Sequence, residues 1–580
     1  MMARLAQFVF IILCCAPQLP VCQPKNRLAG KAQENQQLSQ FIGRYRMMDE
    51  SVLIVDVEDG NLTARPILWK STQFLRSAAR DTFVVDDRPD RQLVFLRNSK
   101  GGVAAARCSG IGDTGTFPRL EKEPAPIELL FRGRPREACT AMMLTHPRQA
   151  AMLVNVGKAF LRSFPSRAAD ATVFLRKLSE EFPTSSRVHS AFADSYIATG
   201  QRAAALKSYQ DAYREDSTNE SAVTGLRRLN ALPTGYPSDD GWVLPFSLDS
   251  VFAKPTDAEI RSMETAWSKR DLSSPNAAIV ARYRLNLGHT DAEVRIIEYT
   301  VHGFQCYGAI IVPDELLGTH APVILELRGV AWNYPPLNLN SDLIAPRILD
   351  FDQGKFIYFV PSFRGEIIQI NGTQYTSEGD RSDAFDGATD DALVLLNTAF
   401  RLTPEADTTR ICAFGKSRGG TVALLAGIRD NRISSVLDWV GPMEWFELMG
   451  SGGWSQRELA ADGLRMKATP RESGGQFIER YLKKSVDGTR GLNEVRLQMI
   501  ASSPLYFARR LPRLEAHYGI EDDMVPIRNG EALRAALNHH GEPRASSKFF
   551  FHKNAGHDLN RTIAFRESRA FVLDVLYAQH

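Results

Sequence analysis

Residues 40–125 alternate between hydrophobic and polar positions over short stretches, with the two-residue period of half-buried β-strands. The stretch "SVLIVDVEDGNLTARPI" predicts a strand, an Asp-Gly turn and a second strand, and "RQLVFLRNSKGGVAAARC" repeats this design around Lys-Gly-Gly. We therefore expect a small all-β domain here. No candidate catalytic set lies in it, which favours a packing or substrate-contact module.

Between residues 140 and 230 the apolar positions change to the period of an α-helix. Small and aromatic residues here follow the spacing of a tetratricopeptide repeat, at Ala193, Tyr196, Gly200, Ala205, Tyr209 and Ala212. Ser217 stands where that repeat usually has proline. One and a half repeats are too short for a long groove, so we expect a helical stack between domains in preference to peptide recognition. Contact with another protein or with the chain's own C-terminal domain stays open.

Residues 231–288 contain a turn-rich linker and a lead-in, and from residue 289 onward short apolar strands alternate with helical stretches. "EVRIIEYTV" and "CYGAIIVP" predict an antiparallel pair. The later strands are "PVILELRG", "KFIYFVPS", "TRICAFGK", "SSVLDWVG", "LEAHYGIE" and "SKFFFHKN". This alternation predicts an α/β domain over residues 289–578, with a doubly wound, mostly parallel sheet covered on both faces. The long segment 443–500 predicts a cap inserted between two strands.

The N-terminus changes the picture of where the protein acts. Arg4 precedes the apolar run "LAQFVFIILCCAPQLPVC", which is long enough for the core of a signal peptide and short for a membrane span. Residues 1–22 therefore predict a signal peptide or, through Cys22, a lipoprotein leader. We expect export to the periplasm or the extracellular space and no membrane span after the leader is removed. An uncut N-terminal anchor is the alternative.

Composition excludes several classes of function. The formal net charge is +3 over 580 residues, which gives no support to nucleic-acid binding. Four of the seven cysteines, Cys108, Cys139, Cys306 and Cys412, lie beyond the leader, too few for a disulfide framework. No Cys/His spacing resembles a zinc site, so the sequence gives no support to a metal site.

The stretch "ICAFGKSRGG" permits two kinds of chemistry. Gly415-Lys416-Ser417 ends like a phosphate-binding loop, but that loop needs a glycine where Arg410 stands, and an apolar strand fills the interval. The same residues match Gly-x-Ser-x-Gly between a strand and a helix, the turn that presents a nucleophilic serine. Ser417 is therefore the candidate nucleophile.

A nucleophilic serine needs a histidine base that a carboxylate orients. Asp522 and Asp523 follow the strand "LEAHYGI", and His557 follows the strand "SKFFFHK". The ends of parallel strands lie at one edge of the sheet, and Ser, Asp, His is the chain order in α/β-hydrolases. The three positions predict a catalytic triad.

Residues 289–578 resemble the catalytic domain of the prolyl oligopeptidase family of serine hydrolases. The matching stretches are "VPSFRGE", "TDDALVLLN", "GKSRGG", "SPLYFARRLPRLEAHYGIEDDMVP" and "NAGHD". The resemblance selects Asp522 over Asp523 as the acid and His557 over His552 as the base. It implies acyl transfer through a covalent serine ester, without a metal or cofactor.

The remaining site residues are less clearly marked. The backbone N–H of Arg418 is expected to bind the oxyanion. The second donor is expected in "ELRGVAWNYPP", from Gly329, Val330 or Tyr334, where the family often has His-Gly-Gly-Pro. For substrate contact the candidates are Arg364, Trp445 and Trp454. A salt bridge for Arg364 and a place in the core of the cap for the two tryptophans are the structural alternatives.

The sequence thus predicts an exported serine hydrolase, and the resemblance favours cleavage of peptide bonds in short peptides. The family usually filters substrates through a β-propeller, and the N-terminal half shows no repeating blades. A carboxylic or carbohydrate esterase is therefore the second hypothesis. A non-catalytic binding protein that uses the helical repeat is the third, and the order of the triad argues against it.

Overall fold

The protein is described from a computed structural model of the 580-residue chain. The structure describes residues 38–48, 51–58, 60–69, 72–85, 88–112, 114–121, 123–147, 149–233, 244–330, 335–465, 475–539, 547–559 and 561–577. The chain divides into two compact units, one of Met1–Ile67 with Thr72–Glu123, the other of Leu68–Ser71 with Pro124–His580. The leader expected at residues 1–22 lies outside the described residues.

The N-terminal unit is one antiparallel sheet whose eight strands pair in sequence order. The strands are β1 (Gly43–Arg46), β2 (Val52–Glu58), β3 (Asn61–Pro66), β4 (Gln73–Ala79), β5 (Thr82–Val85), β6 (Arg88–Arg97), β7 (Val103–Ser109) and β8 (Gly115–Pro118), preceded by the short helix η1 (Ser39–Phe41). Tyr45 of β1 forms an antiparallel bridge with Arg119, just beyond β8, so the sheet returns to its first strand. The side chains of Phe41, Phe83 and Phe95 contact one another inside it. An all-β domain was predicted here, and the structure contains one.

A helical region begins the second unit. Its helices are α2 (Pro126–Phe131), α3 (Pro135–Thr145), α4 (Ala150–Ser163), η2 (Pro165–Arg167), α5 (Ala168–Glu181), α6 (Ser186–Ala198), α7 (Arg202–Glu215) and α8 (Glu220–Arg228). Tyr209 of α7 is buried and donates to Asp194 of α6 at 2.6 Å. A Cβ at Gly225 would overlap the Tyr209 ring, so glycine at this position allows α8 to pack on α7.

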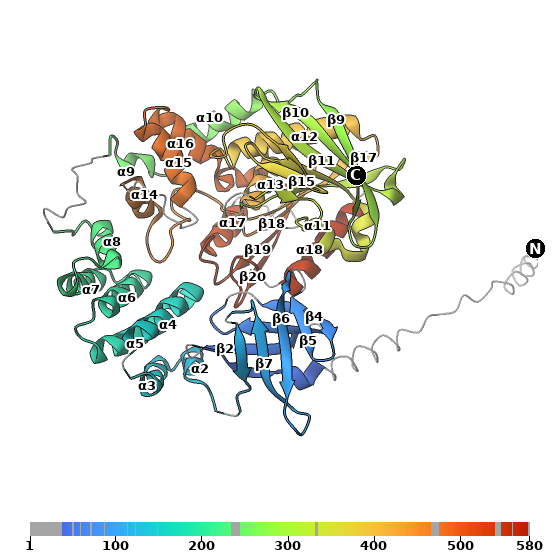
Figure 1. Ribbon diagram of the computed structural model, residues 1–580. Helices are drawn as coiled ribbons and strands as arrows, with labels where there is room; N and C mark the ends of the chain where they lie inside the picture. The colour runs from blue at the N-terminus through green and yellow to red at the C-terminus, as the bar shows by residue number, and fades with distance from the viewer. Residues whose placement is uncertain are drawn as a thin grey trace, which may run out of the picture. The chain divides into compact units, whose positions relative to one another are not determined.

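The rest of the second unit is built on a nine-stranded mixed sheet in the order β20-β19-β18-β17-β12-β14-β11-β10-β9 (Figure 1). The strands are β9 (Ala278–Asn286), β10 (Asp291–Val301), β11 (Phe304–Pro313), β12 (Ala321–Leu327), β14 (Ile357–Ser362), β17 (Ala406–Lys416), β18 (Ile433–Trp439), β19 (Arg513–Gly519) and β20 (Lys548–His552). In this order, the neighbours from β20 through β12 to β14 are paired in parallel. The pairs β14–β11, β11–β10 and β10–β9 are antiparallel. The predicted mostly parallel sheet and the predicted antiparallel pair β10–β11 are both present.

Helices cover both faces of this sheet. They are α9 (Leu248–Val251), α10 (Asp257–Ser268), η3 (Asp314–Leu316), α11 (Ala345–Leu349), η4 (Asp350–Lys355), α12 (Asp386–Leu402), α13 (Arg418–Arg429), η5 (Pro504–Arg510), α17 (Arg528–His539) and α18 (Arg561–Tyr577). Val323 and Leu325 of β12 join the core that contains α12 and α13, whereas Ile324 joins the core that contains α11 and α18. Alternate residues of one strand therefore face two separate cores.

Two additions complete this unit. A small sheet contains β13 (Leu337–Asn338), β15 (Ile367–Ile370) and β16 (Thr373–Thr376). Between β18 and β19, the segment 443–500 contains α14 (Gln456–Arg465), α15 (Gly475–Val486) and α16 (Leu492–Ala501). This is the insertion for which a cap was predicted, and we call it the cap segment.

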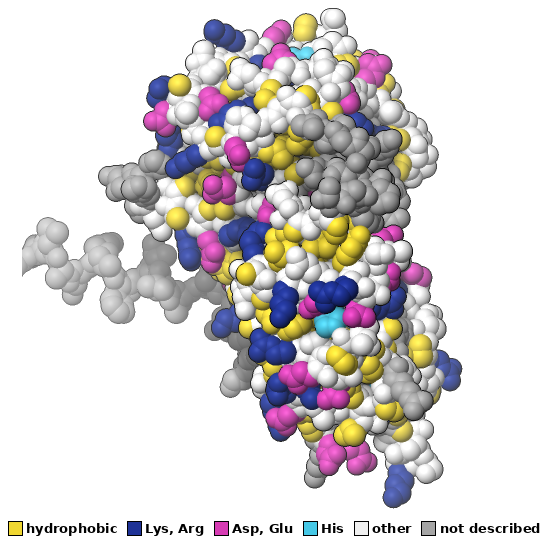
Figure 2. Space-filling view, turned by 90° about the vertical axis from the view of Figure 1, so that its left-hand side faces the viewer, with side chains coloured by type: hydrophobic (Ala, Val, Ile, Leu, Met, Phe, Trp, Pro, Cys, Tyr) yellow, Lys and Arg dark blue, Asp and Glu magenta, His cyan; other side chains and the backbone are white. Residues whose placement is uncertain are grey.

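Surface charge and general composition add little to the assignment of function. On the face shown in Figure 2, Lys and Arg side chains are interspersed with Asp and Glu, as the net charge of +3 leads one to expect. Within the described residues, no helix has the length and apolar character needed to cross a membrane. Among these same residues, no group of three or more His, Cys, Asp or Glu side chains is arranged to hold a metal ion.

Candidate active site

Ser417 occupies a strained turn between β17 and α13. Its φ is +58°, a value rare for a residue with a side chain, and its N–H donates to the Trp439 carbonyl of β18 at 2.7 Å. A Cβ at Gly419 would overlap the carbonyl of Leu327, and one at Gly415 would overlap the backbone of Gly419. The two glycines of Gly-x-Ser-x-Gly are therefore required by close backbone packing on both sides of the serine.

Asp522 lies in the loop that follows β19. Its side chain is buried, and Oδ1 accepts the backbone N–H groups of Met524 at 2.8 Å and Val525 at 2.9 Å. The other oxygen, Oδ2, lies 2.8 Å from Nδ1 of His557. The backbone thus fixes one carboxylate oxygen while the second is directed at the imidazole.

His557 lies in the loop that follows β20, and its side chain is 16% exposed. We call the loop that carries His557 the base loop and the loop that carries Asp522 the acid loop, after the roles predicted for these residues. The two loops are joined by a hydrogen bond, which the N–H of Glu521 donates to the Ala555 carbonyl at 2.9 Å. His552, the other histidine considered, lies within β20, where Nε2 is 3.0 Å from Nδ1 of His517. Burial lowers the pKa of His552 to about 4, so its ring stays neutral and belongs to the core.

An ion pair connects the nucleophile loop to the base loop. Nζ of Lys416, the residue before Ser417, lies 2.8 Å from Oδ1 of Asp558, the residue after His557. Ser417, Asp522 and His557 thus come from loops after β17, β19 and β20, which run parallel in one sheet. The structure brings the three predicted triad residues to one edge of the sheet.

Gly329 of the predicted oxyanion loop lies against the nucleophile turn. A Cβ built on Gly329 would be 3.0 Å from the Lys416 carbonyl oxygen and 3.5 Å from Cβ of Ser417. Val330 follows it and is half-buried. Tyr334, the third candidate for the second oxyanion donor, lies outside the described residues.

The side chain of Arg418 holds the loop that contains Gly329, a role that sequence reasoning did not assign. Its guanidinium is buried, forms a two-point ion pair with Glu366 and lies 4.7 Å from the centre of the Phe363 ring. Nη2 also donates to the Gly329 carbonyl at 3.3 Å. The residue whose N–H is the expected oxyanion donor thus also holds, through its side chain, the loop in which the second donor is expected. Glu366, in the quoted stretch "VPSFRGE", is the partner that was missed.

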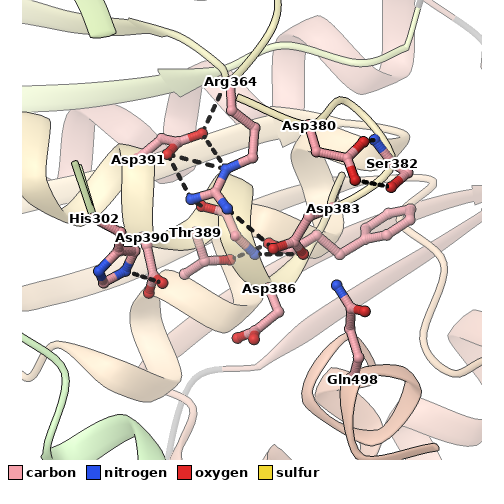
Figure 3. Close-up of polar contacts among 12 residues, drawn as sticks. His302, Arg364, Asp380, Ser382, Asp383, Asp386, Thr389, Asp390, Asp391 and Gln498 are labelled. Atoms are coloured by element: carbon pink, nitrogen blue, oxygen red, sulfur yellow. Dashed lines mark hydrogen bonds and ion pairs between the residues drawn. The ribbon is translucent and has the colours of Figure 1, made fainter. Parts of the chain in front are cut away.

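Arg364, proposed for substrate contact, is held in a buried polar network (Figure 3). Its Nε and Nη2 bind Asp391 of α12, its Nη1 lies 3.0 Å from Asp383, and Nη2 donates to the Gly387 carbonyl. Burial raises the pKa of Asp391, and the adjacent guanidinium opposes that rise. The structure gives Arg364 the salt-bridge role that was the alternative.

The two tryptophans of the cap segment are also packed into the protein. Trp445 is buried, its Nε1 donates to the Ser502 carbonyl at 2.9 Å, and its ring contacts Phe385. Trp454 is packed with residues of α6, α7 and α8 of the helical region, with the guanidinium groups of Arg202 and Arg228 5.5 and 5.3 Å from its ring. The substrate-contact role considered for Trp445 and Trp454 therefore gains no support from their surroundings.

Comparisons with known proteins give distant likenesses. No protein-family model matches the chain, and no curated protein matches it. Among solved structures, acetyl xylan esterase 1 from Thermoanaerobacterium sp. JW/SL YS485 is 15% identical with a TM-score of 0.39 and covers 57% of this chain and 99% of its own. The acylaminoacyl peptidase of Pyrococcus horikoshii is 19% identical with a TM-score of 0.34 and covers 48% of this chain and 40% of its own. Dipeptidyl peptidase 4 of Porphyromonas gingivalis is 16% identical with a TM-score of 0.32 and covers 49% of this chain and 36% of its own. Likenesses of this size assign neither a family nor a substrate to the chain.

Proposed function

We propose that the protein is a serine hydrolase in which Ser417 attacks, His557 moves the proton and Asp522 orients His557. One observation carries the proposal: Nδ1 of His557 lies 2.8 Å from Oδ2 of Asp522, whose other oxygen is held by backbone N–H groups, at the edge of the sheet where Ser417 stands in a turn with φ +58°. A carboxylate, an imidazole and a strained serine are the parts that nucleophilic acyl transfer needs.

The chemistry follows from that arrangement. The contact with Asp522 assigns a proton to Nδ1 of His557 and leaves Nε2 as the base. As Oγ of Ser417 bonds to the substrate carbonyl carbon, its proton passes to Nε2. The imidazolium returns that proton to the leaving amine or alcohol, and an acyl-serine remains. Water then repeats the two steps, which releases the acid and restores the serine.

The oxyanion that forms in each step needs fixed donors. Arg418 is the first residue of α13, and the backbone N–H groups of the first turn of a helix have no acceptor within that helix. The second donor in the proposal is an N–H at Gly329 or Val330, on the loop that the Arg418 side chain holds. No metal or cofactor takes part in the proposed steps.

Peptide bonds of short peptides are the leading substrate in this proposal, supported by the motifs shared with the prolyl oligopeptidase family. One observation favours esters as the second candidate. The N-terminal unit, as far as it is described, is a single eight-stranded sheet and not a set of propeller blades. A filter of the usual kind for that family is thus not seen in the described residues.

A non-catalytic role for the helical region as a peptide receptor is disfavoured by one contact. Apolar side chains of α6, α7 and α8 form one core cluster with Trp454, which belongs to the same chain. The part of the helical region that packs with Trp454 is therefore not open to a peptide.

A substrate panel tests the proposed function. Purified protein is assayed on aminoacyl and dipeptidyl aryl amides and on short-chain aryl esters, beside Ser417→Ala and His557→Ala. We expect turnover that both substitutions abolish, and labelling of the wild type alone by an active-serine phosphonate. Turnover of esters without amides rejects the peptidase assignment in favour of the esterase. Activity that survives Ser417→Ala rejects this site as the catalytic one.

Export remains part of the proposal, through the leader at residues 1–22. Expression of the full chain with and without these residues, followed by cell fractionation, tests it. We expect the full chain outside the cytoplasm and the shortened chain inside it.

A further inference from the structure

The helical region touches the loop that carries the catalytic acid. Ser166, in η2 between α4 and α5, donates its backbone N–H to Oε2 of Glu521 at 3.3 Å. The hydroxyl of Ser166 donates to Oε1 of the same carboxylate. Glu521 immediately precedes Asp522, so a residue of the helical region binds the direct neighbour of the proposed catalytic acid.

Glu521 is in a position where it needs such a partner. The residue is 4% exposed, and an ionised carboxylate removed from water is costly unless hydrogen bonds replace its hydration. Both of its oxygens accept a bond from Ser166. The carboxylate therefore holds the acid loop against the helical region.

The turn that carries Ser166 is itself held in place. Arg167, the next residue, donates to the carbonyls of Leu130 at 2.7 Å and Phe131 at 3.1 Å and pairs with Asp170. Its guanidinium also lies over the rings of Phe131 and Phe160. Ser166 thus approaches Glu521 from a turn fixed at several points.

The effect of this contact can reach the imidazole through the backbone. The N–H of Glu521 is bonded to the Ala555 carbonyl in the base loop, and the next residue, Asp522, is bonded to His557. A rotation or shift of Glu521 therefore alters both connections between the acid loop and the base loop. Misplacement of a catalytic group by about 1 Å can cost about 100-fold in rate.

We propose that Ser166, through Glu521, is a positioning residue for the catalytic acid, so that the helical region sets the orientation of Asp522 towards His557. This inference rests on the proposed function, because it concerns the efficiency of that triad. It gives the helical region a role in turnover that needs no external peptide or protein partner.

The test compares Ser166→Ala, Glu521→Gln and the double variant in the full-length protein. The probes are p-nitrophenyl acetate turnover and the rate of labelling by an active-serine phosphonate. We expect each single variant to lower kcat and the labelling rate by about tenfold at unchanged KM, because positioning and not ground-state binding is lost. The double variant is expected to lose no more than the worse single variant, because both changes break one contact.

Two further variants separate positioning from general stability. Ser166→Thr keeps the hydroxyl and is expected to restore at least half of the wild-type rate. Ser179→Ala is the matched control, since Ser179 lies about 17 Å from the start of α5, and its hydroxyl bonds only the local Arg176 carbonyl among the described contacts. It is expected to leave the rate unchanged. Thermal unfolding of every variant checks that the protein is folded.

The outcomes distinguish failure of the proposed function from failure of the positioning role of Ser166. If the wild type is labelled no faster than Ser417→Ala, the proposed function fails. If the wild type is labelled and folded Ser166→Ala and Glu521→Gln keep its rate, the proposed function stands and this inference is overturned. Additive losses in the double variant, or an equal loss in Ser179→Ala, overturn the inference as well. If Ser166→Ala does not fold, the rate of Glu521→Gln relative to wild type still decides it, with Ser166→Thr, which keeps the hydroxyl, as its control.

Discussion

Ser417 keeps an unfavourable backbone conformation because its neighbours bond to it on both sides. A sparsely populated φ, ψ pair costs of the order of 1–3 kcal/mol. The serine N–H donates to Trp439, and the serine carbonyl accepts the N–H of Gly420 at 2.9 Å. These bonds connect the turn to β18 and to the first turn of α13. They hold the serine at the edge of the sheet where the loops that carry Asp522 and His557 also lie.

Asp522→Asn tests the orientation of the imidazole. An amide in place of the carboxylate can donate to Nδ1 of His557 and so favours the wrong tautomer. We expect kcat to fall by about 10⁴-fold with little change in KM. Asp523→Asn is the matched control, because it makes the same change in the neighbouring carboxylate of the same loop, whereas the contact with Nδ1 of His557 belongs to Asp522. Equal losses in the two variants would contradict the assignment of Asp522.

The Lys416–Asp558 pair gives a second prediction at this scale. The ammonium of Lys416 holds the pKa of Asp558 below its usual range, so the carboxylate is charged at neutral pH. The Asp558 side chain is 58% exposed, so the pair is screened by solvent. We expect Lys416→Met to lower kcat by about 1.4- to fivefold, the rate equivalent of the 0.2–1 kcal/mol of such a pair.

The reversed pair serves as its control. Lys416→Asp combined with Asp558→Lys is expected to recover the rate, whereas either reversal alone is not. Steady-state assays at low and high salt check the cause, because 1 M salt is expected to remove most of the difference between wild type and Lys416→Met. A salt-independent difference would mean that the charge of Lys416 is not what matters.

At the scale of the elements, β18 carries a buried carboxylate, Asp438, close to α13, the helix that follows Ser417. Asp438 accepts hydrogen bonds from the Tyr518 hydroxyl at 2.7 Å and the Gly441 N–H at 3.0 Å. A Cβ at Gly420 of α13 would overlap its Oδ1, so α13 packs directly against this group. Burial raises the pKa of Asp438 to about 7.

This raised pKa predicts how stability changes with pH. The folded protein binds the Asp438 proton more tightly than the unfolded chain, so the contribution is fully present below pH ~4 and is lost as the pH rises towards 7. We expect Asp438→Asn to become more stable relative to wild type over that range, by several kcal/mol at most. Thermal unfolding of both proteins from pH 4 to pH 8 measures it. A constant difference between the two melting temperatures would contradict the prediction.

The elements that could be predicted are those with local signals. Gly415, Ser417 and Gly419 mark a strand–turn–helix whose geometry depends on residues a few positions apart, and the ends of β19 and β20 followed from short apolar runs. The mostly parallel sheet followed from the alternation of strands and helices. The chemistry expected from Ser417, Asp522 and His557 stays a prediction until it is assayed.

What could not be predicted depends on contacts between distant segments. Ser166 and Glu521 are separated by 355 positions, and no periodicity or motif connects them. From the sequence, Trp454 is a candidate to line a substrate pocket. Only the structure shows that it packs with residues of α6, α7 and α8. Arg364 likewise acquires its role from Asp391 of α12, a partner that becomes close only when β14 and α12 pack together.

At the scale of the second unit, the described residues attach the helical region to the α/β part at two places. One is Ser166 with Glu521. The other is the cap segment, where α14 lies beside α8 (Figure 1) and Arg202 forms a two-point ion pair with Glu458. Asp462 of α14, which is almost fully buried, pairs with Arg227 and Arg228 of α8. Two attachments that far apart in sequence make the helical region part of the scaffold around the site.

The attachment at the cap depends most on Trp454. The residue is 8% exposed, belongs to the same hydrophobic core cluster as Ile197 and Tyr209, and has two guanidinium groups over its ring. The backbone of Gly453 also approaches the Ile197 carbonyl so closely that a Cβ there would overlap it. We expect Trp454→Ala to lower the free energy of unfolding by about 3–5 kcal/mol, the usual cost of removing a buried tryptophan. Among the described residues, the cluster that contains Trp454 includes no residue of the nine-stranded sheet. The exchange rate of backbone amide hydrogens is therefore expected to rise in α6, α7, α8 and α14 and to stay unchanged in β17 and β18. Equal acceleration in the helices and in the sheet would mean that the second unit opens as one cooperative body, and unchanged exchange in α6–α8 would mean that Trp454 does not hold the helical region to the cap segment.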